Sequence, residues 1–418
     1  MIQRFKSIFK KNKTLIHNFS YLSILQVFNL LLPLITYPYL IRVLGGDRYG
    51  LVIFTQSVIG YLVILVSFGF NISATKEISI YRDNKNKLDE IVSSTLLSKF
   101  LLFIISFLIL GILLYILPQA KDYKTLFILT MWMCLYEAIF PMWYFQGLEK
   151  MKYITFITLI SRLIFLGLIF VFIHHPSDYL YIPIINGIGA IIAGIISLII
   201  VFKIDKINFI IPKLSTFKNN LEDSYPLFIS RVSSIKDNTP IFLIGMFMGN
   251  QAVAYYDLSY KVIKIIISIF DNVTNVVFPK IANSKNHTML KKIVKVEFLL
   301  LICSYLLITA LSKYIILFLG GSSMLPAQPL FFITGVLLLR PLSSIIGSSV
   351  LIINGLTKEF MLNLIYSTIF YFFITIVLIP LGYINIYTLS STIVLAQIFE
   401  FIHRIYIIKK NNLIHWVV

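Results

Sequence analysis

The sequence predicts an all-α polytopic membrane protein, and three observations support this fold class. Hydrophobic residues make up 58% of the chain and charged residues only 13%, whereas soluble domains carry about 25% charged residues. Twelve apolar runs are each long enough to cross a bilayer as a helix. The basic residues, which give a net charge of +18, gather in alternate loops between these runs. This pattern indicates membrane topology, and we expect no nucleic acid as a partner.

The predicted spans fall into two halves of six. They lie at about 15–43, 49–75, 93–117, 125–147, 153–173, 179–202, 225–249, 254–281, 293–318, 328–354, 360–380 and 384–408. The longest segment outside a span, 203–224, separates the halves, which predicts six-helix bundles at 1–210 and 211–418. Because each half has an even number of spans, both enter the membrane from the same side and the bundles are parallel.

The loops predict that both termini are cytoplasmic. With the N-terminus inside, the inner segments hold 23 basic residues and the outer loops hold 4. Basic residues favour the cytoplasmic side of a membrane. The segment 203–224 is therefore also expected inside.

The first half contributes polar side chains that are mostly uncharged. Asn29 and Gln56 belong to polar stripes with helical spacing along the first and second spans. Interhelical hydrogen bonding explains such stripes about as well as a hydrated cavity does. Glu137 and Arg162 add charge in the fourth and fifth spans. The aromatic run 143–145 is predicted to form part of an interfacial belt at a span end.

The second half contains the most charged spans. The run 225–249 includes Arg231, Lys236 and Asp237. A charge at mid-bilayer costs about 2.5–3.5 kcal/mol, so such residues are expected to face protein or water. The run 254–281 places six polar residues at steps of three and four, which puts them on one face of a helix; they are Asp257, Lys261, Lys264, Ser268, Asp271 and Asn275.

The charge balance within the spans predicts an anion-binding cavity. Buried cations outnumber acids, which implies a hydrated, positive cavity. The predicted substrate contacts are Arg231, Lys236, Lys261, Lys264, Arg162 and Arg340. Arg231 is the first candidate, because a guanidinium stays charged and can grip phosphate with two hydrogen bonds. The alternative is internal ion pairing, for which Asp257 and Lys261 have the favourable i,i+4 order.

Enzymatic chemistry is not indicated. The sequence contains no phosphate loop, zinc cluster or nucleophile elbow, and the short outer loops leave no room for a catalytic platform. We therefore predict a non-enzyme that needs no metal or cofactor. The candidates for ion coupling or gating are Asn29, Gln56, Glu137, Asp237 and Glu400. Each of the three acids could equally balance a neighbouring cation.

Five stretches of the chain resemble the Wzx-type flippases of O-antigen and capsular repeat units. They are PYLIRVLGGDRYG at 38–50, GFNISATKEI at 69–78, FPMWYFQGLEKM at 140–151, YPLFISR at 225–231 and VFPK at 277–280. The resemblance covers about residues 18–410. Lys76 is a departure, since arginine is more usual at that position of the motif.

The resemblance implies the fold of the multidrug/oligosaccharidyl-lipid/polysaccharide exporters. That fold is MATE-like, with two six-helix bundles in a V and a central cavity, cationic in this case. The implied substrate is an undecaprenyl-pyrophosphate-linked oligosaccharide, moved by alternating access from the inner to the outer leaflet of a bacterial plasma membrane. The further partners expected are membrane lipids, a polysaccharide polymerase and a chain-length regulator, with the protein itself a monomer.

Three alternative functions stay open at this point. A lipid II flippase has the same fold and a similar head group. A MATE-type drug antiporter is disfavoured, because cationic drugs require an acidic cavity. A non-transporting scaffold of a polysaccharide assembly complex would tolerate neutralisation of the buried charges. The sequence names neither the glycan nor the energy source.

Overall fold

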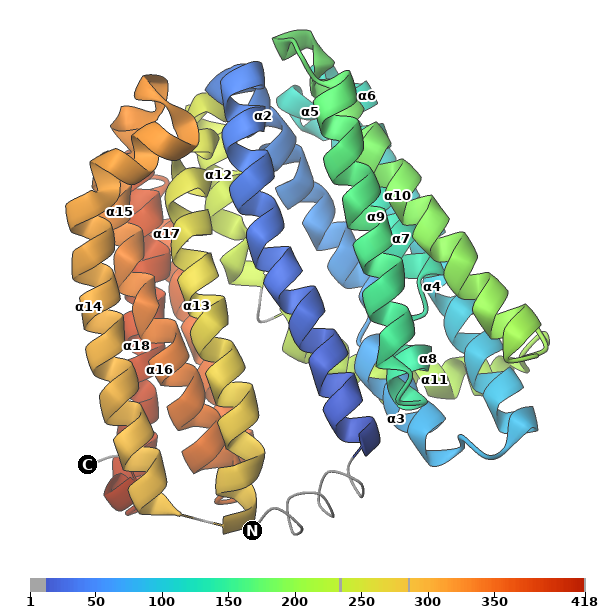
Figure 1. Cartoon of the computed structure of the whole chain (residues 1–418). Coiled ribbons are helices and arrows are strands. Elements are labelled where there is room, and N and C mark those ends of the chain that lie inside the picture. Colours follow the sequence, from blue (N-terminus) through green and yellow to red (C-terminus); the bar gives the residue numbers. More distant parts are fainter. Residues whose placement is uncertain (1–12, 233–234, 285, 417–418) are drawn as a thin grey trace. The chain divides into compact units, whose positions relative to one another are not determined.

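The fold is helical along the whole described chain. The computed structural model describes residues 13–232, 235–284 and 286–416 (Figure 1), and every regular element in these ranges is a helix. Nine of the described helical segments are long and apolar enough to cross a membrane. The prediction of an all-α polytopic membrane protein is therefore confirmed.

The nine segments account for most of the twelve predicted spans. One of them, Ser20–Ile80, covers the first two predicted spans. The predicted spans without a counterpart among the nine are 225–249 and 254–281, which carry the most charge. The total of twelve spans and the cytoplasmic position of both termini stay predictions.

The chain divides into two compact units. Unit 1 comprises Met1–Leu44 and Thr55–Val232, and unit 2 comprises Gly45–Phe54 and Ser233–Val418. This division differs from the predicted boundary at 210/211 in two respects. Helix α11 (Leu214–Val232) packs on α3 (Phe70–Ile80) and α4 (Lys85–Ile116) of unit 1, and the short segment Gly45–Phe54 of the first half belongs to unit 2.

The helices of unit 1 follow one another with short connections. The first, α2 (Lys13–Ser67), consists of two helices joined at Gly45, where φ is 75°. The others are α3 (Phe70–Ile80), α4 (Lys85–Ile116), α5 (Pro118–Asp122), α6 (Lys124–Thr130), α7 (Trp132–Ile139), α8 (Met142–Gly147), α9 (Met151–Phe172), η1 (Pro176–Leu180), α10 (Tyr181–Ile199), η2 (Ile200–Ile204) and α11.

The aromatic run 143–145 lies in the core of unit 1. Trp143, Tyr144 and Phe145 are each at most 1% exposed. They pack in one cluster with residues of α3 and α9, among them Ile78 and Ile154. The prediction of an interfacial belt is therefore wrong for this run. The rings meet protein because α8 packs directly against α3.

The helices of unit 2 begin with short elements and continue with long ones. They are η3 (Ile235–Asp237), α12 (Thr239–Met248), α13 (Asn250–Ser284), α14 (His287–Gly320), η4 (Ser322–Ala327), α15 (Gln328–Gly335), η5 (Val336–Leu338), α16 (Leu339–Ile346), η6 (Gly347–Ile352), α17 (Thr357–Leu378), α18 (Ile386–Lys410) and η7 (Ile414–Trp416). Helix α18 packs against α12, α15, α16 and α17, so it forms the centre of the unit.

The predicted span 225–249 is not one continuous helix. Helix α11 ends at Val232, and α12 begins at Thr239 in the next unit. Pro240 occupies the first turn of α12, where a proline is tolerated because its missing N–H would have no helical partner. The expectation of one continuous helix over 225–249 is therefore wrong, while its crossing of the membrane stays a prediction; Arg231 and Lys236 belong to different units.

The segment Gly45–Phe54 packs closely on the start of α13. A side chain at Gly50 would place its Cβ 1.8 Å from the carbonyl oxygen of Asn250, so only glycine permits this approach. Phe54 stacks with Phe242 of α12, with ring centroids 6.1 Å apart. These contacts explain why the segment belongs to unit 2.

Candidate substrate-binding site

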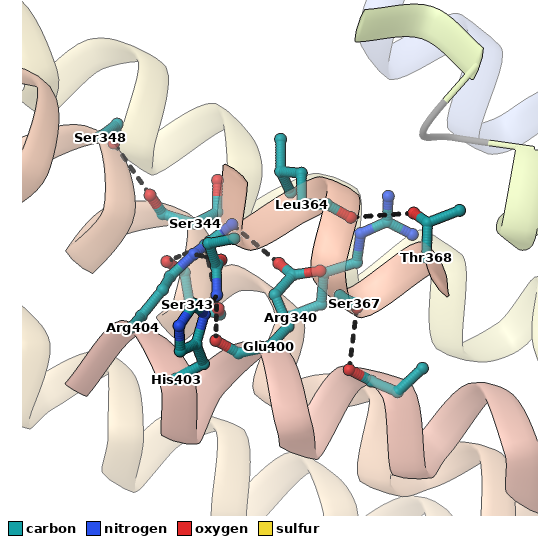
Figure 2. Close-up of polar contacts among 12 residues, drawn as sticks. Arg340, Ser343, Ser344, Ser348, Leu364, Ser367, Thr368, Glu400, His403 and Arg404 are labelled. Carbon is teal, nitrogen blue, oxygen red and sulfur yellow. Dashed lines mark hydrogen bonds and ion pairs between the residues drawn. The ribbon is translucent and has the colours of Figure 1, made fainter. Parts of the chain in front are cut away.

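The charged side chains of unit 2 form two groups that differ in exposure. The first is a buried network of Lys236 on η3 with Glu400 and Arg404 on α18; Figure 2 shows the side chains of Glu400 and Arg404. Lys236 Nζ lies 2.8 Å from one carboxylate oxygen of Glu400, and Arg404 Nη2 lies 2.8 Å from the other. Each of the three residues is at most 5% exposed, so the network is closed to a large ligand.

Polar side chains of two further helices complete this buried network. Arg404 Nε donates to Asn363 Oδ1 at 2.7 Å, and Arg404 Nη1 donates to Ser343 Oγ at 2.9 Å. Lys236 Nζ also donates to Ser367 Oγ at 2.7 Å. The network therefore ties η3, α16, α17 and α18 together. Removing one partner from such a buried pair typically costs about 3–5 kcal/mol.

The second group, which we call the accessible cation cluster, consists of Lys261 and Lys264 on α13 and Arg340 on α16. Lys264 is exposed and lies within electrostatic reach of both other members and of Asp237 and Asp257. Its Nζ forms no ion pair with any residue in the described ranges. Three cations with two acids leave the cluster with a net positive charge.

Two members of the accessible cation cluster are paired. Arg340 Nη2 lies 2.8 Å from Asp237 Oδ2, with the arginine side chain 39% exposed. Lys261 Nζ lies 2.6 Å from Asp257 Oδ2, and the lysine side chain is 31% exposed. The i,i+4 pair considered as the alternative to substrate contact therefore exists. Both cations nevertheless keep enough exposed surface to accept further hydrogen-bond acceptors.

Arg162 lies in unit 1, at a small cavity. The cavity has a volume of about 30 Å³ and is lined by Arg162, Trp132, Tyr136 and Asn186, among others. Trp132 Nε1 has no hydrogen-bond partner there, and Arg162 forms no ion pair within the part of the chain that the structure describes. A space of this size holds about one water molecule, so it is too small for a sugar or a pyrophosphate.

Arg231 is exposed in the last turn of α11. Arg231 lies on α11, which is not among the described segments long and apolar enough to cross a membrane. Its proposed phosphate contact stays a prediction, and its accessibility is compatible with that contact.

The three acids predicted to couple ions are all ion-paired. Glu137 Oε1 lies 2.8 Å from Lys99 Nζ, and Asn71 donates to the same oxygen at 3.0 Å. Asp237 pairs with Arg340, and Glu400 pairs with two cations. The two uncharged candidates lie on α2, with Asn29 exposed and Gln56 half-buried. A role for these residues in coupling stays a prediction.

One buried acid, Glu297, is absent from the sequence-based candidates. It lies on α14 and is 3% exposed. Neither carboxylate oxygen has a hydrogen-bond partner. The sequence does show an acidic residue in the apolar run 293–318. Comparing spans by their number of charges gives a single acid little weight, so Glu297 was not selected.

Comparison with protein families identifies the chain. The model of the family described as polysaccharide biosynthesis protein matches residues 15–285. The chain belongs to this family. Two relatives of this chain carry the name "Putative O-antigen transporter". The one from Escherichia coli strain K12 is 28% identical over 354 residues, covering 82% of this chain and 85% of the relative. The one from Shigella dysenteriae is 28% identical over 268 residues, covering 63% and 67%.

Solved structures show the same fold at low sequence identity. The inward closed conformation of the lipid II flippase MurJ superposes with a TM-score of 0.73 at 17% identity, covering 94% of this chain and 87% of MurJ. An inward-facing MATE family transporter of the MOP superfamily gives a TM-score of 0.64 at 12% identity, covering 92% and 94%. The fold is therefore that of these multi-pass membrane transporters.

Proposed function

We propose that the protein is a flippase for a lipid-linked oligosaccharide of a bacterial surface polysaccharide. The cargo is an undecaprenyl-pyrophosphate-linked repeat unit, which moves from the cytoplasmic to the outer leaflet of the plasma membrane by alternating access. Membership of the polysaccharide biosynthesis family and the names of the two relatives support this proposal. The same names favour a transporter over an enzyme.

The accessible cation cluster is the observation that carries the proposal. The head group of such a cargo is an anionic pyrophosphate with sugars attached, which is too polar to enter hydrocarbon. Lys264 offers a charge without an acidic partner among the described residues, and Arg340 adds a half-exposed guanidinium. Hydrogen bonds between such cations and phosphate oxygens are about twice as strong as neutral ones. The cluster therefore suits the pyrophosphate, the part that the candidate cargoes share.

We assign different roles to the predicted cations on this basis. Lys261, Lys264 and Arg340 contact the pyrophosphate, and Arg231 is a further phosphate contact in unit 1. Lys236 is buried and forms an ion pair with Glu400, and this ion pair stabilises the packing of unit 2. Arg162 is too enclosed to receive the head group directly and orders the polar interior of unit 1.

The test is a conditional depletion of the protein in its host. We expect lipid-linked oligosaccharide to accumulate in the cytoplasmic leaflet, where a membrane-impermeant glycosidase added outside does not reach it, while surface polysaccharide is lost. Mass spectrometry of the trapped lipid then identifies the glycan. Arrest of peptidoglycan synthesis with normal surface polysaccharide would instead select a lipid II flippase. Continued glycan export would refute the proposal.

A further inference from the structure

Glu297 is a buried acid in a described apolar span of unit 2, and neither of its carboxylate oxygens has a hydrogen-bond partner. It lies ten residues after the start of α14 at His287, which places it about 15 Å along the helix. The predicted apolar run of this helix starts at 293, so Glu297 lies about 6 Å into that run, on the side of His287. The residue is 3% exposed, and both oxygens are unpartnered. A carboxylate in such a place is costly, whereas a neutral carboxylic acid is tolerated far better.

The helix that packs against α14 contributes two further polar groups at this depth. Helices α13 and α14 lie side by side and join at one end (Figure 1). Thr274 lies ten residues before the end of α13 at Ser284, so the antiparallel pairing places it opposite Glu297. Its hydroxyl is also buried and without a hydrogen-bond partner. Asp271, one turn earlier on the same face, acts electrostatically on Glu297.

The other elements that pack on α14 do not neutralise Glu297. Among them, η4, α15 and η5 contain no charged residue. Helix α16 contributes Arg340, which is paired with Asp237. Element η7 contributes His415, which stacks with His287 at the start of α14, ten residues from Glu297. No cation on these elements pairs with Glu297 in the described part of the chain, and the charged group that acts on it from α13 is Asp271.

We propose that Glu297, with Thr274 and Asp271 beside it, is a proton-binding site of the transporter. The Glu297 carboxylate takes up a proton on one oxygen and becomes a neutral acid, and it releases that proton when the site meets water. A single oxygen suffices for a proton, whereas a metal ion needs several converging ligands. The described residues hold no group of three or more acidic, histidine or cysteine side chains suited to a metal. Intramembrane acids of this kind serve as proton relays in pumps and transporters.

Proton binding at this site couples the transport proposed above to the proton gradient. This coupling rests on the proposed function. The acids predicted from the sequence to couple ions are all held by cations, so each would have to break an ion pair in order to bind a proton. Glu297 has no such pair to break. Proton binding there would change the charge of unit 2 by one, close to the cationic helix α13.

Infrared spectroscopy tests the proton site directly. The purified full chain in lipid nanodiscs is compared with E297Q and with E222Q, whose side chain is 63% exposed in the native chain. At neutral pH we expect a carboxylic acid C=O band in the native protein, its loss in E297Q and its retention in E222Q. Raising the pH should remove the band in the native protein. A spectrum unchanged by E297Q would overturn the proposal, as would a band removed by sodium chloride but not by choline chloride at constant pH.

Export measurements test the coupling separately. We expect nigericin, which collapses the pH gradient, to reduce glycan export by the native protein, while export by E297Q is low and no longer depends on that gradient. Export by E297Q that equals native export and still depends on the gradient would refute coupling through Glu297 and leave the flippase proposal intact. If the native protein exports no glycan, the flippase proposal fails, and the infrared result still decides whether Glu297 holds a proton.

Discussion

Replacing Lys264 by glutamine should impair transport without harming folding. The side chain is exposed and has no ion pair in the described part of the chain. Its cation–π contact with Tyr260, at 5.9 Å from Nζ to the ring centroid, is worth about 0.5–1 kcal/mol at an exposed site. Loss of one charged hydrogen bond to phosphate costs about 1.5–3 kcal/mol. Since each 1.4 kcal/mol is about a factor of ten, export per molecule should fall about ten- to hundredfold.

The matched control is the same substitution in the buried network. Lys236→Gln removes one of the two cations that share Glu400, and this should cost about 3–5 kcal/mol of stability. Typical proteins are stable by only about 5–15 kcal/mol, so the amount of protein in the membrane should fall. The Lys236 ammonium has no accessible surface for a head group, so export by each remaining molecule should be nearly normal.

The assay measures surface polysaccharide and divides it by the amount of transporter in the same membranes. Lys264→Gln is expected to have a low ratio with normal protein, and Lys236→Gln a near-normal ratio with little protein. A normal ratio for Lys264→Gln would show that the accessible cation cluster does not bind the cargo. A low ratio for Lys236→Gln at normal abundance would show that the buried network opens during transport.

Three further predictions concern other parts of the chain. Arg231→Ala should lower export per molecule while the lysine variant recovers part of it; normal export by the alanine variant would make Arg231 structural. Gly50→Ala should reduce the amount of folded protein, because the new Cβ would lie 1.8 Å from a backbone oxygen. Gly111→Ala should be harmless, because a Cβ there meets nothing within 4 Å. Equal thermal stability of the two variants would contradict the close packing at Gly50. In a cysteine-free background, an impermeant thiol reagent should label a cysteine at Lys121 but not one at Lys213 in intact cells; labelling at Lys213 would reverse the topology.

Charge pattern and hydropathy predict the class of this protein and the location of its cations, but not their burial. The stripe on α13 follows from helical spacing alone, and α13 is continuous across it. The i,i+4 partner Asp257 of Lys261 is visible in the sequence, but other partners are not, because they come from distant positions. Lys236 and Glu400, for example, are 164 residues apart and lie on separate elements.

Averaging over a window explains one incorrect prediction and one omission. The run 225–249 is apolar on average, so the break between α11 and α12 has little effect on its mean hydropathy. Glu297 is lost for the same reason, since one acid changes the hydropathy of a long apolar run very little. The burial of Trp143 has a different cause, the packing of α8 on α3, which no local pattern encodes.

The membership of Gly45–Phe54 in unit 2 has a consequence for the biogenesis of the protein. This segment leaves the ribosome long before the remainder of unit 2, which begins at Ser233. Tyr49 must then remain without its bonding partner Asp257 until α13 has been inserted. Contacts so distant in sequence form slowly, because the chain must first close a long loop. Unit 2 therefore completes its folding only after translation has passed α13, and a fragment that starts at Ser233 should lack part of its core.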